Sequence, residues 1–379
     1  THGFRLASAD GGAWEELVHR CADALLPAAP VSPGCIRVGF VYASAGLAPQ
    51  LSAIEAMLRE RLGIEHWVGT VGLGVIATAQ ELYSDQSLVV LVGDLPADGL
   101  RLISGLRALD QPEVDDLMAW SQGRDGVWGI LHGDPSNPRT PELVSGLARA
   151  LPGARFAGGL TSAEERFPQV AGRTTAGGIS GILFDTAKVP VRFAHTQGCT
   201  PIGPIRQVTE AKGNIAITLD HRPALEVMKE DIGEVLARDL RRAAGYIFAG
   251  LPLGEDPNSG SDYLVRNLVG IDPDQGLIAI GDVIGQGQPL MFCRRDGNTA
   301  RSDLTRMLTE VQSSLERPPR AAIYISCLGR GRHQFGESSQ ELKLVAENLG
   351  HLPLAGFFAN GELFNNRLYG YTGVLTLFA

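Results

Sequence analysis

Several motifs that identify common enzyme classes are missing from this chain of 379 residues. Only four lysines occur and none follows a glycine, so the phosphate-binding loop that ends in Gly-Lys-Ser/Thr is absent. No histidine precedes a glutamate, which excludes the HExxH zinc motif, and neither the GxSxG elbow nor the GxGxxG fingerprint occurs. The sequence therefore argues against a P-loop NTPase, a zincin, an α/β-hydrolase and a Rossmann dehydrogenase.

Cysteine and long apolar runs are also scarce. Cysteines stand at positions 21, 35, 199, 293 and 327. Because their number is odd, their spacing is wide and no CxxC occurs, the sequence argues against a disulfide framework and against a metal site built from cysteines, and it favours a reducing cytoplasm. The longest apolar runs, such as Leu88–Val92, are far shorter than the ~18 residues of a membrane span, and no signal peptide is recognisable.

The charge balance is mildly acidic. The 33 Lys and Arg against 42 Asp and Glu give a net charge of −9, which argues against nucleic acid or an anionic membrane as the main partner. Glycine is abundant, at 47 residues, and indicates many tight turns. At ~150 residues per domain, the length predicts two or three domains.

The chain repeats one unit three times. Each copy has an apolar strand that ends in small or polar residues, a helix with leucines at helical spacing, a glycine that ends the helix, and a second strand followed by a glycine-rich turn. The copies begin with strands at 36–42, 127–131 and 322–326. Ser338 and Glu341 are interpreted as a capping box at the start of the third helix.

The glycine spacings support the repeat. Gly63 to Gly69, Gly153 to Gly159 and Gly350 to Gly356 are each six residues apart. A further apolar strand follows each unit, at 88–92, 181–184 and 373–378. We therefore expect three β-α-β units that superpose, two in an N-terminal domain and one in a C-terminal domain.

Between the second and third copies the pattern changes to short strands joined by turns. These strands are expected at 189–193, 215–219, 263–268, 276–280 and 290–293, with helices at 224–244 and 302–315. The fold class predicted is α/β (α+β), with two domains of mixed β-sheets flanked by helices. The boundaries predicted are an N-terminal helical extension at 1–35, with one helix at 13–26, and domains at 36–220 and 221–379.

Polar side chains gather after both strands of the third copy. They are predicted to line a ligand site in the C-terminal domain, formed by Cys327, Arg330, Gly331, Asn360, Gly361 and Glu362. The carboxyl ends of parallel strands open on the same side, where ligands gather, and glycines let backbone amides approach a ligand closely. An arginine, an amide and a carboxylate would orient a small zwitterion such as an amino acid.

Other interpretations of the same residues stay open. Arg330 and Glu362 could pair only to hold two loops together. Cys327 could be a buried core residue, or a nucleophile whose pKa the nearby arginines lower. His132, His195, His333 and His351 are candidate axial haem ligands, although covalent haem is excluded because no CxxCH occurs.

Several segments resemble one known family. YLVRNLVGID (263–272), YISCLGRG (324–331) with the following Phe335-Gly336, AGFFANGEL (355–363) and LYGYTGVLTLF (368–378) resemble the FIST C-terminal domain. The GGISGILF segment (177–184) and the glycine turns of the first half are similar to the FIST N-terminal domain.

The resemblance implies a sensory module of signalling proteins that binds small molecules such as amino acids and has no settled catalytic residues. It also implies that some members bind haem and sense nitric oxide, so haem stays open as a cofactor. We therefore expect a small-molecule sensor without enzymatic activity that signals through a separate protein partner and that could be a homo-oligomer. The alternatives are a haem-based nitric-oxide sensor and an enzyme that uses Cys327.

Overall fold

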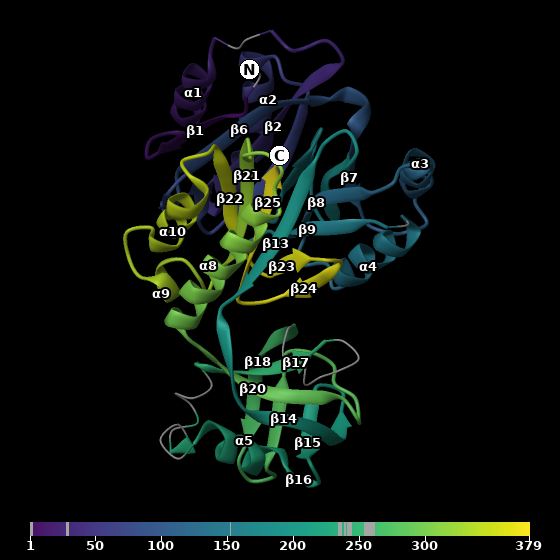
Figure 1. Cartoon of the computed structure of the whole chain (residues 1–379), viewed down its shortest axis with the longest axis vertical. Helices are drawn as coiled ribbons and strands as arrows, with labels where there is room; N and C mark the ends of the chain where they lie inside the picture. Colours follow the sequence, from purple (N-terminus) through teal and green to yellow (C-terminus); the bar gives the residue numbers. More distant parts are fainter. Residues whose placement is uncertain are drawn as a thin grey trace. The chain divides into compact units, whose positions relative to one another are not determined.

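The computed structural model of the chain divides into two compact units. Unit 1 comprises residues 1–197 and 302–379, and unit 2 comprises residues 198–301 (Figure 1). The structure describes residues 3–27, 30–151, 153–233, 237–238, 240, 245–253 and 262–379. No helix among these residues is long and apolar enough to cross a membrane.

The three expected β-α-β repeats are confirmed, and all of them lie in unit 1. The first comprises β2 (Cys35–Ser44), α2 (Leu51–Leu62) and β3 (His66–Gly72). The second comprises β8 (Val127–Gly133), α4 (Thr140–Ala150) and β9 (Arg155–Leu160). The third comprises β21 (Ala321–Cys327), α10 (Gln340–Leu349) and β22 (Leu354–Ala359). In each repeat the two strands pair in parallel, so that a helix crosses over between them.

The additional strand expected after each repeat is confirmed as well. These strands are β6 (Ser87–Pro96), β12 (Ile179–Asp185) and β25 (Thr372–Phe378). Each pairs antiparallel with the first strand of its own repeat. A further edge strand then lies beside each of them, namely β1 (Arg5–Asp10), β7 (Leu100–Leu106) and β13 (Val191–Gln197).

Short hairpins exchange between the repeats. They are β4 (Val75–Ala77) with β5 (Gln80–Leu82), β10 (Gln169–Ala171) with β11 (Thr174–Thr175), and β23 (Glu362–Phe364) with β24 (Arg367–Tyr369). The hairpin that follows the first repeat pairs with β22 of the third, the one that follows the second pairs with β3 of the first, and the one that follows the third pairs with β9 of the second. The result is three six-stranded sheets, each completed by a neighbour.

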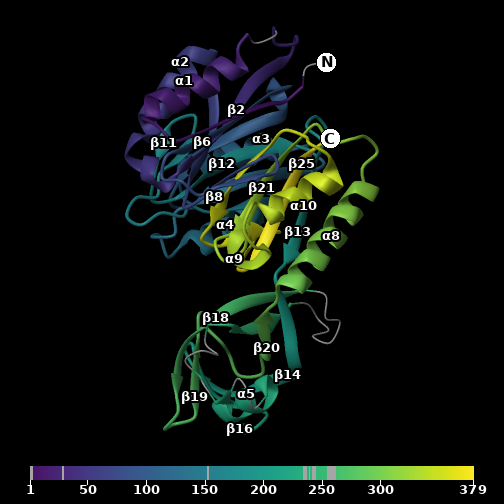
Figure 2. The same ribbon diagram turned by 90° about the vertical axis from the view of Figure 1, so that its left-hand side faces the viewer.

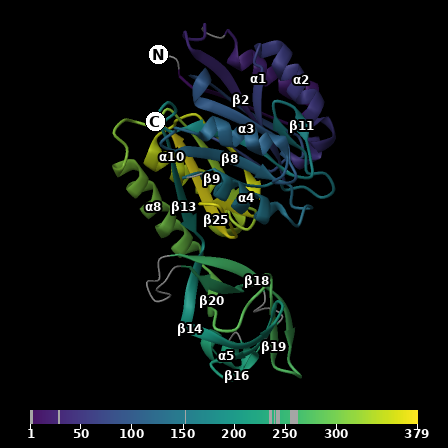
Figure 3. The ribbon, with the colours of Figure 1, turned by 90° about the vertical axis from the view of Figure 1, so that its right-hand side faces the viewer.

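The inner faces of the three sheets share one hydrophobic core. Its buried members include Phe40 and Tyr42 of the first repeat, Ile130 of the second, and Ile325 and Phe357 of the third. The outer face of each sheet is covered by helices. Figure 2 shows α1 (Trp14–Leu25) and α2 together on the first sheet, and Figure 3 shows α3 (Pro112–Ser121) and α4 beside the second.

One glycine in each repeat lies against the neighbouring parallel strand. A Cβ added at Gly69, Gly158 or Gly356 would lie 1.8, 1.9 or 1.7 Å from a backbone carbonyl oxygen of that strand. Only glycine fits at such a distance. The equivalent glycine of the second repeat is therefore Gly158, and the expected equivalence of Gly159 is wrong by one residue.

The N-terminal segment is part of the sheet and is not only a helical extension. The expected helix is present as α1, but β1 precedes it and pairs along its whole length with β6. Residues Ala7 and Ala9 of β1 are buried at alternate positions, as expected for a strand with one covered face. The expectation that 1–35 contains only one helix is therefore wrong.

Unit 2 is an antiparallel structure, as the change of sequence pattern indicated. Its seven-stranded sheet contains β14 (Cys199–Lys212), β15 (Ile215–Leu219), β16 (Arg222–Pro223), β17 (Ile247–Pro252), β18 (Tyr263–Asp272), β19 (Leu277–Ile280) and β20 (Pro289–Arg295). All pairings given for these strands are antiparallel. β14 and β17 were not expected from the sequence.

The helices of this region differ in length from the sequence expectation. Helix α5 (Ala224–Ile232) starts at the expected residue, whereas residues 234–236, 239 and 241–244 of the expected helix lie outside the described residues. Helix α8 (Gly297–Ser313) begins earlier than expected. The expected strand at 189–193 is shifted to β13, which pairs with β25 of the third repeat.

The two compact units do not follow the expected domain division at residue 220. The first two repeats and the third all belong to unit 1, because β25 and β22 share a sheet with β13 and β4, which precede residue 220. Unit 2 is an insertion between the second and third repeats. Long-range strand pairing of this kind leaves no local signal in the sequence.

Candidate functional site

The strand ends of the third repeat enclose a buried polar network centred on Glu341. This carboxylate accepts hydrogen bonds from the hydroxyl of Tyr324 (2.7 Å), the hydroxyl of Ser326 (3.0 Å) and the backbone N–H of Gly331 (2.7 Å). The guanidinium of Arg330 lies 2.8 Å from the same carboxylate through both Nε and Nη2. Both charged side chains have no solvent exposure, so the pair is compensated within the core.

This network corrects two sequence interpretations. Glu341 does not form a capping box with Ser338, because α10 begins after Ser339 and has no side-chain cap. Instead, the Glu341 side chain meets the end of β21. Among the described residues, the ion-pair partner of Arg330 is therefore Glu341, and not Glu362 as in the alternative in which Arg330 and Glu362 only hold two loops together.

A hairpin from the first repeat covers this network. The hydroxyl of Tyr83, which follows β5, donates to Glu81 (2.8 Å) and accepts from the backbone N–H of Arg332 (3.2 Å). The Tyr83 ring stacks on Phe358, and the Arg332 guanidinium lies 4.3 Å from the centre of the Tyr83 ring. A Cβ added at Gly331 would lie 2.2 Å from the Tyr83 hydroxyl. Tyr83 therefore covers the strand ends at which the sequence placed a ligand.

Two buried carboxyl groups beside this network have raised pKa values. Burial raises the pKa of Glu362 to about 8, although hydrogen bonds from Thr372 and the charge of Arg330 lower it. Burial also raises the pKa of Glu81 to about 7, opposed by the hydrogen bond from Tyr83 and assisted by the charge of Glu341. Within the part of the chain that the structure describes, Glu362 Oε1 and Arg330 Nη1 are buried without a hydrogen-bond partner.

The remaining residues of the predicted site have different environments. Burial, with the charge of Glu362, raises the pKa of the Cys327 thiol, which is opposite to the lowering expected from the arginines. Asn360 is exposed, and its backbone N–H donates to Leu160 of the second repeat. The carbonyl of Gly361 accepts from the N–H of Leu160. The structure thus brings Cys327, Arg330 and Glu362 into one electrostatic environment, while Asn360 and Gly361 connect two repeats.

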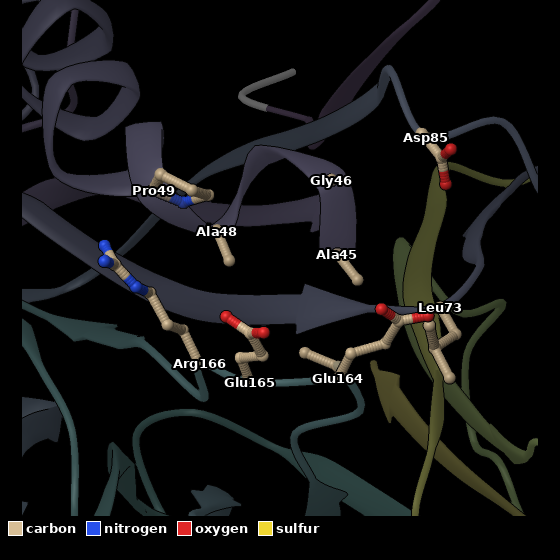
Figure 4. Close-up of a pocket in the computed structure, with 10 residues that line it drawn as sticks. Ala45, Gly46, Ala48, Pro49, Leu73, Asp85, Glu164, Glu165 and Arg166 are labelled. Carbon is tan, nitrogen blue, oxygen red and sulfur yellow. The ribbon is translucent and has the colours of Figure 1, made fainter.

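An open groove lies instead at the strand ends of the first repeat. Its lining comes from the short helix η1 (Ala45–Gln50) after β2, from the turn after β3, from the loop after β9, and from Asp85 in the connection between β5 and β6. It encloses about 410 Å³ and is lined by Ala45, Gly46, Ala48, Pro49, Leu73, Asp85, Ala163, Glu164, Glu165 and Arg166. Figure 4 shows the side chains of Glu165 and Arg166 rising from the loop toward η1.

A second hollow adjoins this groove. It encloses about 530 Å³ and shares Ala48, Pro49, Glu165 and Arg166 with the first. Arg107, Asp134 and Ser136 also line it. The carboxylate of Asp134 accepts hydrogen bonds from the backbone N–H groups of Ser136 (2.8 Å) and Gly177 (2.6 Å), so each of its oxygens has a neutral donor within the protein.

The groove is open because one connection is long. Only residues 73–74 join β3 to its hairpin, and only residues 360–361 join β22 to its hairpin, whereas residues 161–168 join β9 to its hairpin. The long connection moves away from the strand ends and leaves space between itself and η1. At the strand ends of the third repeat, by contrast, Tyr83 stacks on Phe358 and its hydroxyl accepts from the backbone N–H of Arg332. Sequence reasoning missed this site, although the insertion of Glu164-Glu165-Arg166 after the glycine turn was a usable signal.

The histidines do not provide a haem site at the groove. The residues that line the groove and the adjoining hollow include no histidine, cysteine or methionine. His132 is fully buried in the core, where its Nε2 lies 3.2 Å from the Tyr42 hydroxyl and burial lowers its pKa to about 3. His195 packs against Phe364 and Tyr369, and His333 and His351 are exposed. Haem therefore does not fit the groove.

These features define an α/β protein of three intertwined β-α-β repeats with an inserted antiparallel unit. Residues 37–222 match the FIST N domain and residues 224–365 match the FIST C domain. The chain belongs to the family of proteins with these domains, and the resemblance read from the sequence is confirmed.

Two mycobacterial relatives cover most of the chain. An uncharacterized protein of Mycobacterium tuberculosis is 31% identical over 329 residues, which are 82% of this chain and 83% of the relative. An uncharacterized protein of Mycobacterium bovis is 32% identical over 330 residues, which are 82% of each. FIST domains are associated with signal transduction and small-ligand sensing.

Proposed function

We propose that this protein is a sensory protein that binds an amino acid or a related small metabolite in the groove of unit 1, without enzymatic activity. The observation that carries the proposal is the open groove at the strand ends of the first repeat, with one cationic and several anionic side chains. Among the described residues, Arg166 forms no ion pair, and neither do Asp85, Glu164 and Glu165.

The chemistry of the groove suits a zwitterion. The planar guanidinium of Arg166 can bind a carboxylate through two parallel hydrogen bonds. The carboxylates of Asp85 and Glu164 can accept from an ammonium group. The position agrees with the general rule that ligands of α/β proteins bind beyond the carboxyl ends of parallel strands, and a pocket of this volume is typical of small-molecule sites.

The proposal includes a separate signalling protein as the partner that receives the ligand signal. The association of FIST domains with signal transduction supports this part. It also includes a cytoplasmic location, which is supported by the five cysteines, since they form no disulfide with one another.

Ligand-dependent thermal stabilisation tests the proposal. We expect at least one member of a screen of amino acids and related metabolites to raise the unfolding temperature without being converted, since ligand at 100 times its dissociation constant adds ~2.7 kcal/mol. The Arg166→Ala variant should stay folded and bind about 10- to 100-fold more weakly, through loss of a charged hydrogen bond. The control is Arg149→Ala, an exposed arginine of α4 outside the groove. Absence of any stabilising compound would contradict the proposal.

A variant of Arg330 distinguishes binding at the site predicted at the third repeat from binding in the groove. If the ligand binds at Arg330, the Arg330→Ala variant should lose ligand binding while Arg166→Ala retains it. If the groove binds the ligand, Arg330→Ala should lower the stability of the protein and leave its ligand affinity unchanged. The loss of stability is expected because the variant leaves the buried Glu341 charge uncompensated. The enzyme alternative requires turnover that disappears when Cys327 is alkylated, and the raised pKa of its thiol predicts slow alkylation.

A further inference from the structure

We propose that the hairpin of β4 and β5, together with Tyr83 directly after it, is a proton-controlled lid over the strand ends of the third repeat. The lid is closed while Glu81 is protonated, and it opens more readily when Glu81 ionises. This inference goes beyond ligand binding in the groove and does not depend on it, because Glu81 and Tyr83 are not among the residues that line the groove.

The lid is an edge element that side chains hold in place. β4 pairs with β22, whereas β5 is the last strand of that sheet and pairs with β4 alone in the described strand order. The backbone N–H of Glu81 donates to the Ser339 hydroxyl (2.9 Å), and the Tyr83 hydroxyl accepts from the backbone N–H of Arg332 (3.2 Å). The Tyr83 ring stacks on Phe358. A three-residue edge strand attached in this way is suited to open locally while the rest of unit 1 stays folded.

The buried groups at the lid include more carboxyl groups than cations. Glu341, Glu362 and Arg330 have no solvent exposure, and Glu81 is 8% exposed. Arg330 compensates Glu341 in their ion pair. Within the described residues, neither Glu81 nor Glu362 forms an ion pair of its own. Since burial of an uncompensated charge is strongly unfavourable, the closed lid favours the neutral form of Glu81.

The groups around Glu81 support this assignment. Its Oε2 accepts a hydrogen bond from the Tyr83 hydroxyl (2.8 Å), and its Oε1 is buried without a hydrogen-bond partner among the described residues. From α10 it faces the charge of Glu341, and Arg332 of α9 (Arg332–Phe335) lies over the Tyr83 ring. β4 and β22 contribute no titratable side chain.

The proton affinity of Glu81 differs between the closed and the open lid. In the closed lid, burial raises the pKa of Glu81 from an ordinary value of 4.5 to about 7. The hydrogen bond from Tyr83 and the backbone N–H groups of Leu342 and Glu341 oppose this rise, and the charge of Glu341 adds to it. In the open lid the carboxyl group lies in water and has its ordinary pKa. The closed lid therefore binds the proton more tightly, and its stability is lost as the pH rises from 4.5 to 7.

The size of the effect follows from these two pKa values. The equilibrium constant for opening should rise about 40-fold between pH 5 and pH 7. Above pH 7 the closed lid also loses the proton, so the further rise between pH 7 and pH 8 should be about twofold.

Hydrogen–deuterium exchange of the full chain at pH 5, 6, 7 and 8 tests the inference. The readout is the protection of the backbone amides of Glu81 and Arg332, corrected for the intrinsic effect of pH on exchange, because both amides donate to groups across the lid contact. We expect their protection to fall about 40-fold from pH 5 to pH 7 and to level off above pH 7. The internal reference is the equivalent hairpin of β10 and β11, whose sequence at 169–175 contains no carboxyl group.

Two variants assign the effect to Glu81. In Glu81→Gln the side chain cannot ionise and its amide oxygen can still accept from Tyr83, so the protection should not depend on pH. Glu337→Gln, an exposed glutamate in the turn before α10, is the matched control and should behave as the natural protein. Tyr83→Phe leaves Glu81 in place but removes a hydrogen bond that lowers its pKa, so the protection of the Glu81 amide should level off at a pH above 7.

Three results would overturn the inference. The first is protection of the Glu81 and Arg332 amides that stays constant from pH 5 to pH 7 in the natural protein. The second is a fall of the same size in Glu81→Gln or, if that variant does not fold, levelling off at an unchanged pH in Tyr83→Phe. The third is an equal fall at the hairpin of β10 and β11, which would assign the pH dependence to unit 1 as a whole.

Discussion

Glu362 is predicted to make the stability of unit 1 depend on pH in the neutral range. The carboxyl has no solvent exposure, and its pKa is raised by burial from an ordinary value of 4.5 to about 8. Between these two pH values the folded protein holds a proton that the unfolded chain has released. The free energy of unfolding must therefore fall as the pH rises through this range, since stability decreases wherever the native state binds more protons.

The magnitude follows from the two pKa values. Each unit of difference corresponds to ~1.36 kcal/mol, so Glu362 lowers the free energy of unfolding by ~5 kcal/mol between pH 4.5 and pH 8. The Glu362→Gln variant stays neutral over the whole range. Its amide oxygen can accept the two hydrogen bonds that Thr372 donates, at 3.2 and 2.8 Å. We expect the variant and the natural protein to differ little at pH 5 and the variant to be several kcal/mol more stable at pH 8.5.

Urea unfolding at a series of pH values measures this difference. All four tryptophans, at positions 14, 67, 120 and 128, lie in unit 1, so tryptophan fluorescence reports the unit that contains Glu362. Comparison of variant with natural protein cancels the contributions of other titrating groups, such as Glu81. Glu347→Gln, an exposed glutamate of α10, is the control. A difference between Glu362→Gln and the natural protein that stays constant from pH 5 to 8.5 would refute the reasoning.

Three further perturbations test the fold. Glu341→Gln removes the anion that compensates the fully buried Arg330 and should lower the free energy of unfolding by about 3–5 kcal/mol. A loss below about 1 kcal/mol would contradict the argument that Arg330 depends on Glu341 for charge compensation. Gly69→Ala places a Cβ 1.8 Å from a carbonyl oxygen and should lower the free energy of unfolding by over ~3 kcal/mol or prevent folding. The matched change Gly63→Ala, at a φ of +63° with open space around it, should lower it by only ~1–2 kcal/mol. Equal losses would contradict the packing argument. His132, whose pKa is lowered by burial to about 3, stays neutral in the fold while the unfolded chain gains a proton below pH 6.5. Its contribution to stability is present above pH 6.5 and is lost as the pH falls, by ~3 kcal/mol at pH 4.5, and His132→Phe should flatten that acid limb in the same fluorescence assay.

The sequence by itself determined the three repeats, because their signals are local. Leucines at helical spacing, a glycine after each helix and apolar strands on either side are sufficient to specify a β-α-β unit. The strand that follows each unit was also readable, since a buried strand is a continuous apolar run. The change to alternating short strands between residues 189 and 293 correctly indicated antiparallel pairing.

Only the tertiary structure decided which strands share a sheet and which side chains meet. The exchanged hairpins place Tyr83 over the third repeat and the loop at 161–168 over the first, and both contacts join residues far apart in the sequence. The sequence therefore predicted the type of site, namely polar residues at the ends of parallel strands. The third repeat, which has the most polar strand ends, proved to hold a buried network covered by Tyr83. Arg330 meets Glu341 rather than Glu362 because a helix turn directs the carboxylate back to β21. Such pairings depend on packing between elements, for which spacing along the chain carries no information.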